Sequence, residues 1–457
     1  MKKTVVINVV GLTKRLIGEH TPFIKSFLDR GKASYIKPLL PAVTCSVQST
    51  YVTGKWPSEH GIVGNGWYFK DECEVKFWRQ SNKLVQQPKL WDDLKKKYPN
   101  FTCANHFWWY NMYSNVDYSL TPRPNYLADG RKIPDVYSHP AQLRDEMQGT
   151  LGTFPLFEFW GPKTTINSSK WIADAAMLTD KKHHPDLTLI YLPHLDYNLQ
   201  RYGLDFKVIS KDLNEIDGVV KKLVNYYESL ETRVILLSEY GITNVNRPIH
   251  LNRVLRKEGY IAIREERGLE LLDAGASEAF AVADHQIAHI YCKHPDTVQR
   301  IIELVTPLAG VEKVLFGETL KDANIAHERC GDIVVVADRD SWFTYYFWED
   351  DAKAPDYARM VDIHKKPGYD PVEMMTDPKD KLVMAKVIGK LIKKKLGFRT
   401  VMDIIPIDAT LIKGSHGRQT EDQEDFPIFI SNQKTAIKKE SITAIEVRDL
   451  IEDHLLS

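Results

Sequence analysis

The sequence predicts an α/β protein with a mostly parallel central sheet that is flanked by helices on both faces. Short apolar runs rich in β-branched residues recur along the chain, as they do in strands buried on both faces. Amphipathic helical patterns separate these runs, and such alternation is typical of parallel sheets. Sheets of this class carry their chemistry in loops beyond the carboxyl ends of the strands. We therefore looked for polar residues in those loops.

The expected elements follow one another along the chain. The runs that predict strands are 4–10, 187–192, 233–237, 287–292, 332–337 and 426–430. The patterns that predict helices are 169–181, 210–230, 297–304 and 381–396. The second of these places Leu213, Ile216 and Val220 on one face, the spacing of a helix packed on a core. The lysine-rich run 390–395 is interpreted as the solvated face of the last helix.

A chain of 457 residues fits one large domain with insertions or two domains of ordinary size. We find no internal repeat and no low-complexity linker, so we expect a single domain over 1–457. Two stretches, 66–165 and 338–376, break the strand–helix rhythm, and the first is rich in Trp, Tyr, Pro and Asn. We expect both to be irregular insertions that form a cap over the sheet.

The composition excludes several classes of partner. Lys plus Arg and Asp plus Glu both total 61, so the balanced charge gives no general attraction to nucleic acid polymers. Five scattered cysteines form no close pair, which argues against a thiolate zinc site and a disulfide framework. No apolar run approaches the roughly 18 residues of a membrane span. The first residues read as a buried strand and not as a secretory signal, so we expect a cytoplasmic protein.

The segment 41–68 holds the densest set of candidate functional residues. Thr44 follows a Pro-Ala-Val turn and precedes an expected helix. A hydroxyl at such a turn points outward, and the amino terminus of a helix favours an anion such as phosphate. The alternative is that Thr44 is only an N-cap, a common role of threonine.

This segment resembles the nucleotide pyrophosphatase/phosphodiesterase branch of the alkaline phosphatase superfamily. In that branch a nucleophilic threonine precedes the string V-T-G-x-x-P-x-x-H-G-I-x-x-N, and residues 52–65 follow Thr44 in that register. The resemblance implies an alkaline phosphatase-like fold, with Thr44 as the nucleophile and Asn65 holding a phosphoryl oxygen.

The resemblance also implies two divalent cations, usually zinc, on either side of the nucleophile. This sequence departs from the family's ligand set. Val10 stands in the register of an aspartate, and Glu239-Tyr240 stands where the family has Asp-His. Asp196 is kept, but the histidine four residues later is replaced by Gln200. Two complete zinc sites are therefore not encoded.

We expect one divalent cation, Zn, Mn or Mg, held by Asp196, Glu239 and one histidine. His364 and His416 each resemble a form of the family's last ligand, and the sequence does not choose between them. Other side chains that could complete the site are His194 and the group Asp284, His285 and His289. A mixed set of carboxylates and imidazoles suits all three metals.

Two other interpretations of the degenerate site remain open. Catalysis could proceed without a metal, with Tyr240 and a histidine in acid–base roles and Arg418 steadying the phosphate. Alternatively, the chemistry is lost and the cleft only binds a ligand. The aromatic clusters 106–113 and 342–348 either fill the core or form a wall that stacks on a substrate, and we expect Trp67 to contact substrate as well.

The expected function is that of a hydrolase for a small-molecule phosphate ester, in particular a diester. The main alternative is a catalytically silent protein that binds a phosphorylated or aromatic metabolite. Hydrolysis of sulfate esters or phosphonates on the same fold is a weaker third reading. The sequence predicts neither the natural substrate nor the oligomeric state.

Overall fold

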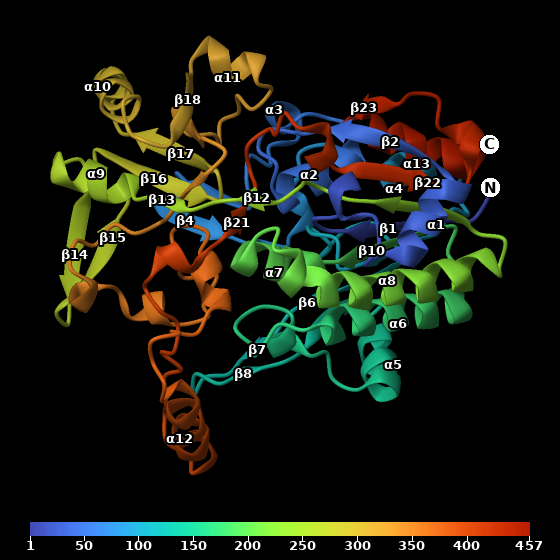
Figure 1. Ribbon diagram of the computed structural model, residues 1–457, viewed down its shortest axis with the longest axis horizontal. Coiled ribbons are helices and arrows are strands. Elements are labelled where there is room, and N and C mark those ends of the chain that lie inside the picture. Colours follow the sequence, from blue (N-terminus) through green and yellow to red (C-terminus); the bar gives the residue numbers. More distant parts are fainter.

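The computed structural model describes residues 1–457 and is organised around a nine-stranded central sheet (Figure 1). Five of its eight neighbouring strand pairs are parallel, so the predicted class is confirmed. In spatial order the strands are β23 (Ser441–Thr443), β2 (Lys32–Lys37), β22 (Ile428–Ser431), β11 (Arg233–Leu237), β1 (Thr4–Val9), β10 (Leu187–Leu192), β5 (Cys103–His106), β6 (Tyr118–Pro122) and β9 (Val136–His139).

The centre of this sheet is its most apolar part. Every residue of β1 and β10 is buried, because helices cover both faces there. This explains the continuous apolar runs in the sequence, since no position of these strands faces solvent. Strands β1, β10 and β11 lie parallel and side by side, so their carboxyl ends meet at one edge of the sheet.

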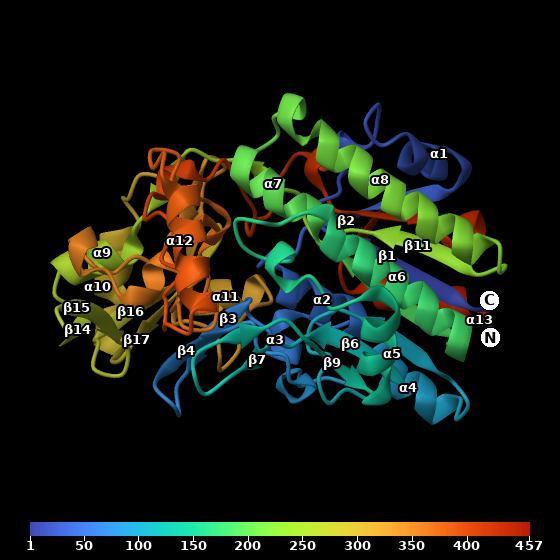
Figure 2. The same cartoon turned by 90° about the horizontal axis from the view of Figure 1, so that it is seen from below.

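Helices pack on the two faces as the sequence predicts (Figures 1 and 2). One face carries α6 (Ile166–His183) and α8 (Phe206–Glu228), with α1 (Pro22–Arg30), α5 (Gln142–Leu151) and α7 (His194–Tyr202) beside them. The other face carries α2 (Thr44–Thr53), α4 (Leu90–Lys97) and α13 (Glu446–Leu456). In α8 the predicted inner face is buried, including Leu213, Ile216 and Val220.

Four strands form a second, wholly antiparallel sheet: β16 (Ala279–Asp284), β17 (Ile287–Cys292), β19 (Ile333–Ala337) and β18 (Val311–Phe316). The runs 287–292 and 332–337 are strands as predicted, but their expected place in the parallel sheet is wrong. Only His285 and Gln286 join β16 to β17, and a two-residue connection permits only antiparallel pairing. Strand β22 is also antiparallel to both of its neighbours, β2 and β11.

The second sheet packs on a separate apolar core with α9 (Leu251–Lys257) and α10 (Pro295–Val305). This core takes in the aromatic cluster 342–348, in which Phe347 and Trp348 have no exposed surface. The cluster therefore fills a core, as one of the two interpretations held. Short elements complete this region: α11 (Glu318–Asp322), β13 (Arg247–Ile249), β14 (Ala262–Glu266), β15 (Leu269–Asp273) and β20 (Ser341–Phe343). The single domain over 1–457 stays a prediction.

The stretch 66–165 is less irregular than expected. It contributes β5, β6 and β9 to the central sheet and also contains α4 and α5. Its shorter elements are β3 (Gly66–Phe69), β4 (Glu74–Phe77), β7 (Asn125–Tyr126) and β8 (Lys132–Ile133). These four strands form two separate two-stranded sheets, and each is too short for its sequence to show a strong period. The stretch 338–376 holds mainly loops and single turns, and its role as a cap stays a prediction.

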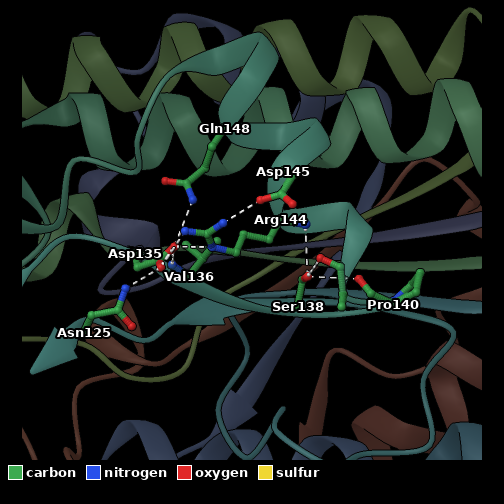
Figure 3. A network of polar contacts seen from close by, with 9 residues as sticks. Asn125, Asp135, Val136, Ser138, Pro140, Arg144, Asp145 and Gln148 are labelled. Atoms are coloured by element: carbon green, nitrogen blue, oxygen red, sulfur yellow. Dashed lines mark hydrogen bonds and ion pairs between the residues drawn. The ribbon is translucent and has the colours of Figure 1, made fainter.

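One buried carboxylate organises this edge of the central sheet (Figure 3). Asp135 precedes β9 and accepts both Nε and a terminal nitrogen of Arg144, at 2.7 and 2.8 Å. Gln148 and Asn125 donate to the same carboxylate, so it links α5 to the β7–β8 segment. Burial alone would raise the pKa of Asp135, but these donors hold it below its usual value. The edge is thus closed by an ion pair with geometry that favours strong binding.

Helix α12 (Val383–Lys395) projects away from both sheets (Figure 1). Its lysines Lys393, Lys394 and Lys395 are exposed, as the sequence predicts. None of the helices combines the length and the apolar character needed to cross a membrane.

Candidate active site

Thr44 is the first helical residue of α2, and Val43 is the N-cap. The Thr44 hydroxyl makes no capping bond, so the interpretation of this residue as an N-cap is wrong. The amide groups of a first helical turn have no acceptor within the helix, and they favour an anion at this point. Only 3% of Thr44 is exposed. The helix therefore presents this hydroxyl to the protein interior, where its partners are fixed side chains.

A chain of hydrogen bonds runs from Thr44 through Tyr240 to Asp196. The Thr44 hydroxyl lies 3.0 Å from the Tyr240 hydroxyl, which donates to Asp196 Oδ1 at 3.2 Å. Because Tyr240 gives its hydrogen to Asp196, its oxygen is free to accept the hydrogen of Thr44. The chain ends in a group that takes up protons, and it is oriented to draw a proton away from Thr44.

The groups of this chain have perturbed proton affinities. Burial raises the pKa of Asp196 to about 7, although hydrogen bonds from Tyr240 and Gln200 act in the opposite direction. Burial also raises the pKa of Tyr240 well above its usual value, and the nearby Asp196 and Glu239 add to the effect. Asp196 is therefore poised to exchange a proton near neutral pH, a property typical of functional sites.

His416 lies against the same chain. Its ring stacks on Tyr240 with centroids 3.6 Å apart, and its Nδ1 lies 2.7 Å from the carbonyl oxygen of Ala42. A carbonyl only accepts, so Nδ1 carries the hydrogen and Nε2 holds a lone pair. That Nε2 has no hydrogen-bond partner, and it lies 3.8 Å from Asp196 Oδ1. Burial lowers the pKa of His416 to about 3, so the ring is neutral.

Glu239 belongs to a second hydrogen-bond network, which includes Gln48 from the same helix as Thr44. Its Oε1 accepts from Asn8 Nδ2 at 2.5 Å and from Gln48 Nε2 at 2.6 Å, whereas its Oε2 has no partner. Burial raises the pKa of Glu239 to about 8, and the bonds from Gln48 and Asn8 moderate the shift. A buried carboxyl group with two amide donors and no cationic neighbour favours its neutral, protonated form.

Gln200 stands where the resemblance implies a histidine, and it contacts Asp196 by a hydrogen bond. Its Nε2 donates to Asp196 Oδ2 at 2.7 Å, and its Oε1 accepts from Tyr369 at 3.0 Å. The amide thus positions the carboxylate directly, with no lone pair on nitrogen to offer a cation. Tyr369 in turn stacks on His285, whose ring also lies 3.7 Å from that of His416.

Asn65 is held by three polar contacts beside the start of α2. Its Oδ1 accepts from the Cys45 amide at 3.0 Å, and its backbone and side-chain amides donate to the two oxygens of Asp284 at 2.7 and 3.1 Å. Gly64 permits this approach, because a Cβ there would lie 3.1 Å from Asp284 Oδ2. One Asn65 side-chain hydrogen remains for a ligand. The tip of the β16–β17 hairpin therefore fixes the predicted phosphoryl-binding residue.

Three predicted site residues have other contacts. His364 Nδ1 lies 3.4 Å from the carbonyl oxygen of Phe77. Trp67 is buried against Phe69, with the Arg329 guanidinium over its ring. One terminal nitrogen of Arg418, Nη2, lies 2.6 Å from Glu312 Oε2 and 2.7 Å from Glu421 Oε1. Between the two candidate histidines, the geometry therefore favours His416, and the charge of Arg418 is already balanced.

The other two candidate histidines, His289 and His194, have partners away from Thr44. His289 Nε2 lies 2.9 Å from the Val63 carbonyl oxygen and its Nδ1 accepts from the Gly331 amide, so both ring nitrogens have protein partners. His194 points toward α8 instead of toward Thr44, and it contacts Asp212 and Glu215.

Several site residues carry no signal that we recognised in the sequence. Gln48 donates to Glu239 and accepts from the Trp109 amide, and Tyr369 holds Gln200. Gln48 lies four residues after Thr44, hence on the same face of α2, so the helical period could have indicated it. Tyr369 lies in a loop with no period, and only the fold brings it to the site.

The family's two-cation arrangement does not fit this donor set. Val10 and Tyr240 stand where anionic or imidazole ligands would be required, and Glu239 is tied to two amides. One position retains suitable donors. His416 Nε2 carries an unpaired lone pair directed to the region of Asp196, and a carboxylate with a neutral imidazole is a normal pair of ligands.

Comparisons with known proteins show the family of this chain. A family model described as type I phosphodiesterase / nucleotide pyrophosphatase matches residues 4–370. An uncharacterised pyrophosphatase/phosphodiesterase of Schizosaccharomyces pombe is 26% identical over 249 residues, which are 51% of this chain and 44% of that protein. Ectonucleotide pyrophosphatase/phosphodiesterase 2 of Saccharomyces cerevisiae is 27% identical over 263 residues, or 53% and 48% of the two chains. The chain thus spans less than half the length of these relatives.

Solved structures share the fold at low identity. Murine ectonucleotide pyrophosphatase/phosphodiesterase 5, an inactive form in complex with AMP, superposes with a TM-score of 0.61 at 14% identity and covers 100% of this chain and 95% of that chain. Phosphonoacetate hydrolase of Sinorhizobium meliloti, in complex with phosphonoformate, has the same TM-score at 12% identity, with 99% and 96% covered.

Proposed function

Because the chain belongs to the type I phosphodiesterase / nucleotide pyrophosphatase family, we propose that it hydrolyses a small-molecule phosphodiester by attack of the Thr44 hydroxyl. The observation that carries this proposal is the hydrogen-bonded chain from Thr44 through Tyr240 to Asp196. A threonine hydroxyl is a weak nucleophile until a neighbouring group takes its proton, and this chain supplies such a group.

The proposed reaction has two steps. The Thr44 oxygen bonds to phosphorus, the bond between phosphorus and one ester oxygen breaks, and that oxygen leaves as an alkoxide that takes a proton from water. The Thr44 proton passes by way of Tyr240 to Asp196 and from there to solvent. Water then attacks the phosphothreonine and restores the hydroxyl. The free hydrogen of Asn65 and the first-turn amides of α2 would stabilise the phosphoryl oxygens, because they are fixed before charge develops.

One divalent cation, Zn, Mn or Mg, is part of the proposal. Asp196 and His416 would hold it, with Glu239 as a further carboxyl group of the site. When bound, it would supply positive charge near the phosphoryl group. Gln200 keeps Asp196 oriented and Ala42 keeps the His416 lone pair available, so these neighbours prepare the two donors.

The substrate class follows from the fold and its relatives. A fold relative binds AMP, which favours a nucleotide-like ester over inorganic phosphate. The charge of Arg418 is already balanced by Glu312 and Glu421, so this guanidinium is not free for a phosphate, and a diester carries less charge than a monoester. A nucleotide-type diester is therefore the favoured substrate.

The test compares turnover of bis(p-nitrophenyl) phosphate by chelator-treated protein, alone and with Zn²⁺, Mn²⁺ or Mg²⁺. We expect turnover with at least one metal and its loss by about 10³-fold or more in Thr44→Ala. Thr53→Ala is the matched control, because it removes a hydroxyl from the last turn of the same helix, where the group donates to the Ser49 carbonyl oxygen and accepts from the Lys55 amide.

Two results would overturn the proposal. Turnover unchanged in Thr44→Ala would exclude this nucleophile. No turnover with any metal, together with AMP binding by calorimetry to the folded protein, would identify a protein that binds its ligand without hydrolysing it.

A further inference from the structure

A cluster of three metal-capable side chains lies outside the Thr44 site, between helices α7 and α8. His194 begins α7, and Asp212 and Glu215 lie one turn apart on α8. One ligand atom from each lies within 4.8 Å of the other two. These two helices pack against each other side by side (Figures 1 and 2). We propose that this cluster is a second cation site that takes Zn²⁺.

The distances match the spacing of ligands around a bound ion. His194 Nε2 lies 3.2 Å from Asp212 Oδ1 and 3.4 Å from Glu215 Oε2. Two ligand atoms that are each about 2.0–2.1 Å from a tetrahedral zinc lie roughly 3.3 Å apart. The two separations from His194 therefore already match those that zinc would impose, and the Asp212 and Glu215 oxygens lie within 4.8 Å of each other.

The imidazole is unpaired in a manner that a simple ion pair does not explain. The His194 side chain is only 4% exposed, yet neither ring nitrogen makes a hydrogen bond. The carboxylate oxygens are close to Nε2 but do not accept an N–H from it. An oxygen that shares a metal with the nitrogen lies off the axis of the nitrogen lone pair, where it makes a poor hydrogen bond. A buried, unpartnered nitrogen is otherwise costly.

The surroundings suit a cation. Asn198 donates to Asp212 Oδ1 at 2.8 Å and Arg201 donates to Asn198, so the ligand is held from behind. Glu215 is 30% exposed at its side chain, which leaves room for a water as fourth ligand. The imidazole among the donors favours Zn²⁺ over Ca²⁺ or Mg²⁺, which prefer oxygen.

The site lies close to the proposed catalytic carboxylate. Asp196 is two residues after His194, in the same first turn of α7. A cation that joins α7 to α8 would hold that turn in place without touching the Thr44 site. Its effect on the protein is therefore a gain in stability, which is measurable without any substrate.

The experiment titrates chelator-treated, full-length protein with Zn²⁺ alone, by calorimetry and by thermal unfolding. We expect a tight binding event and a rise of a few degrees in Tm for the wild type. In His194→Gln and in Asp212→Asn we expect the affinity for Zn²⁺ at this site to fall at least 100-fold. His183→Gln, which removes another imidazole at the end of α6, should leave it unchanged.

A second variant distinguishes Zn²⁺ binding at the Thr44 site from Zn²⁺ binding at the α7–α8 cluster. His416→Gln should retain the α7–α8 event, whether or not the proposed hydrolase needs a metal. The visible spectrum of the Co²⁺-loaded protein should report a four-coordinate site that depends on His194.

The proposal is wrong if the number of zinc ions bound is the same in wild type, His194→Gln and Asp212→Asn. If in addition metal-free His194→Gln unfolds at a lower temperature than metal-free wild type, the cluster is a structural ion pair.

Discussion

The two sides of Thr44 differ in what their side chains can bind. On one side, Asp196 and His416 keep donor atoms of the kind that cations need, and one lone pair has no partner. On the other side, Glu239 is bonded to Asn8 and Gln48, and its Oε1 is already in use. The first side resembles a metal site with one ligand missing, and the second resembles a neutral hydrogen-bond network.

This difference shows how a two-cation site can be altered without loss of packing. Replacing a histidine by Tyr240 turns a ligand into a link between Thr44 and Asp196. Replacing an aspartate by Glu239 lets the carboxyl group reach two amides, and burial then favours its neutral form. The predictions below test whether the two sides are as different as their contacts indicate.

The largest effect is expected on the Asp196 side. Asp196→Asn removes both the proposed proton acceptor and a proposed cation ligand, so we expect kcat/KM to fall roughly 10³-fold. Addition of metal should no longer change turnover of the diester. Asp174→Asn, which removes a partly exposed carboxylate on α6 that pairs with Lys222, should keep turnover within a few-fold of the wild type. Activity of Asp196→Asn near that of the wild type would remove the distinction between the sides.

A smaller effect is expected for Tyr240, which links Thr44 to Asp196. Tyr240→Phe breaks the path from Thr44 to Asp196 but keeps the ring that stacks on His416. We expect kcat to fall about 10²-fold, with little change in the zinc affinity measured by calorimetry. Tyr345→Phe is the control, because its hydroxyl is buried without a partner in the other core. If kcat is unchanged in Tyr240→Phe, the proton leaves Thr44 by another route.

The smallest effect concerns the stability of metal-free protein. Because the folded-state pKa of Glu239 is raised from 4.5 to about 8, the native state keeps a proton that the unfolded state releases. Stability from this group is complete below pH 4.5 and is lost as the pH rises toward 8, by about 1.4 kcal/mol for each pH unit. Urea unfolding of Glu239→Gln between pH 5.5 and 8 should show a correspondingly weaker decline.

The control for that measurement is Glu303→Gln, which removes an exposed carboxylate on α10 and should follow the wild type. An equal decline in Glu239→Gln and the wild type would mean that Glu239 is ionised in the native state. The two sides of Thr44 would then both be suited to a cation.

The sequence predicted the elements better than their arrangement. Residues 187–192 and 233–237 are strands with the predicted bounds, because a strand buried on both faces has a continuous apolar sequence. The same signal could not assign 287–292 to its sheet, because strands buried in either sheet look alike. The turn of two residues at His285 and Gln286 was the available clue, since it fixes antiparallel pairing.

The site was predicted in part for a similar reason. Thr44 and Asn65 lie in one dense motif, and Asp196, Glu239 and Tyr240 follow strands whose carboxyl ends meet at one edge. The contacts that set their behaviour come from elsewhere: Gln48 from α2 and Tyr369 from a loop. Arg418 looked like a phosphate ligand because the sequence does not show that Glu312, 106 residues away, balances its charge.

The two hydrogen bonds between Asp284 and Asn65 limit how a ligand can enter the site. Both oxygens of this carboxylate reach across from the smaller sheet to two N–H groups beside α2. If the two sheets moved apart here, these N–H groups would lose their acceptors while still buried. Each unsatisfied group would cost roughly 1–3 kcal/mol of free energy. Entry to Thr44 is therefore cheaper by rotation of individual side chains at the rim than by a hinged opening of the molecule.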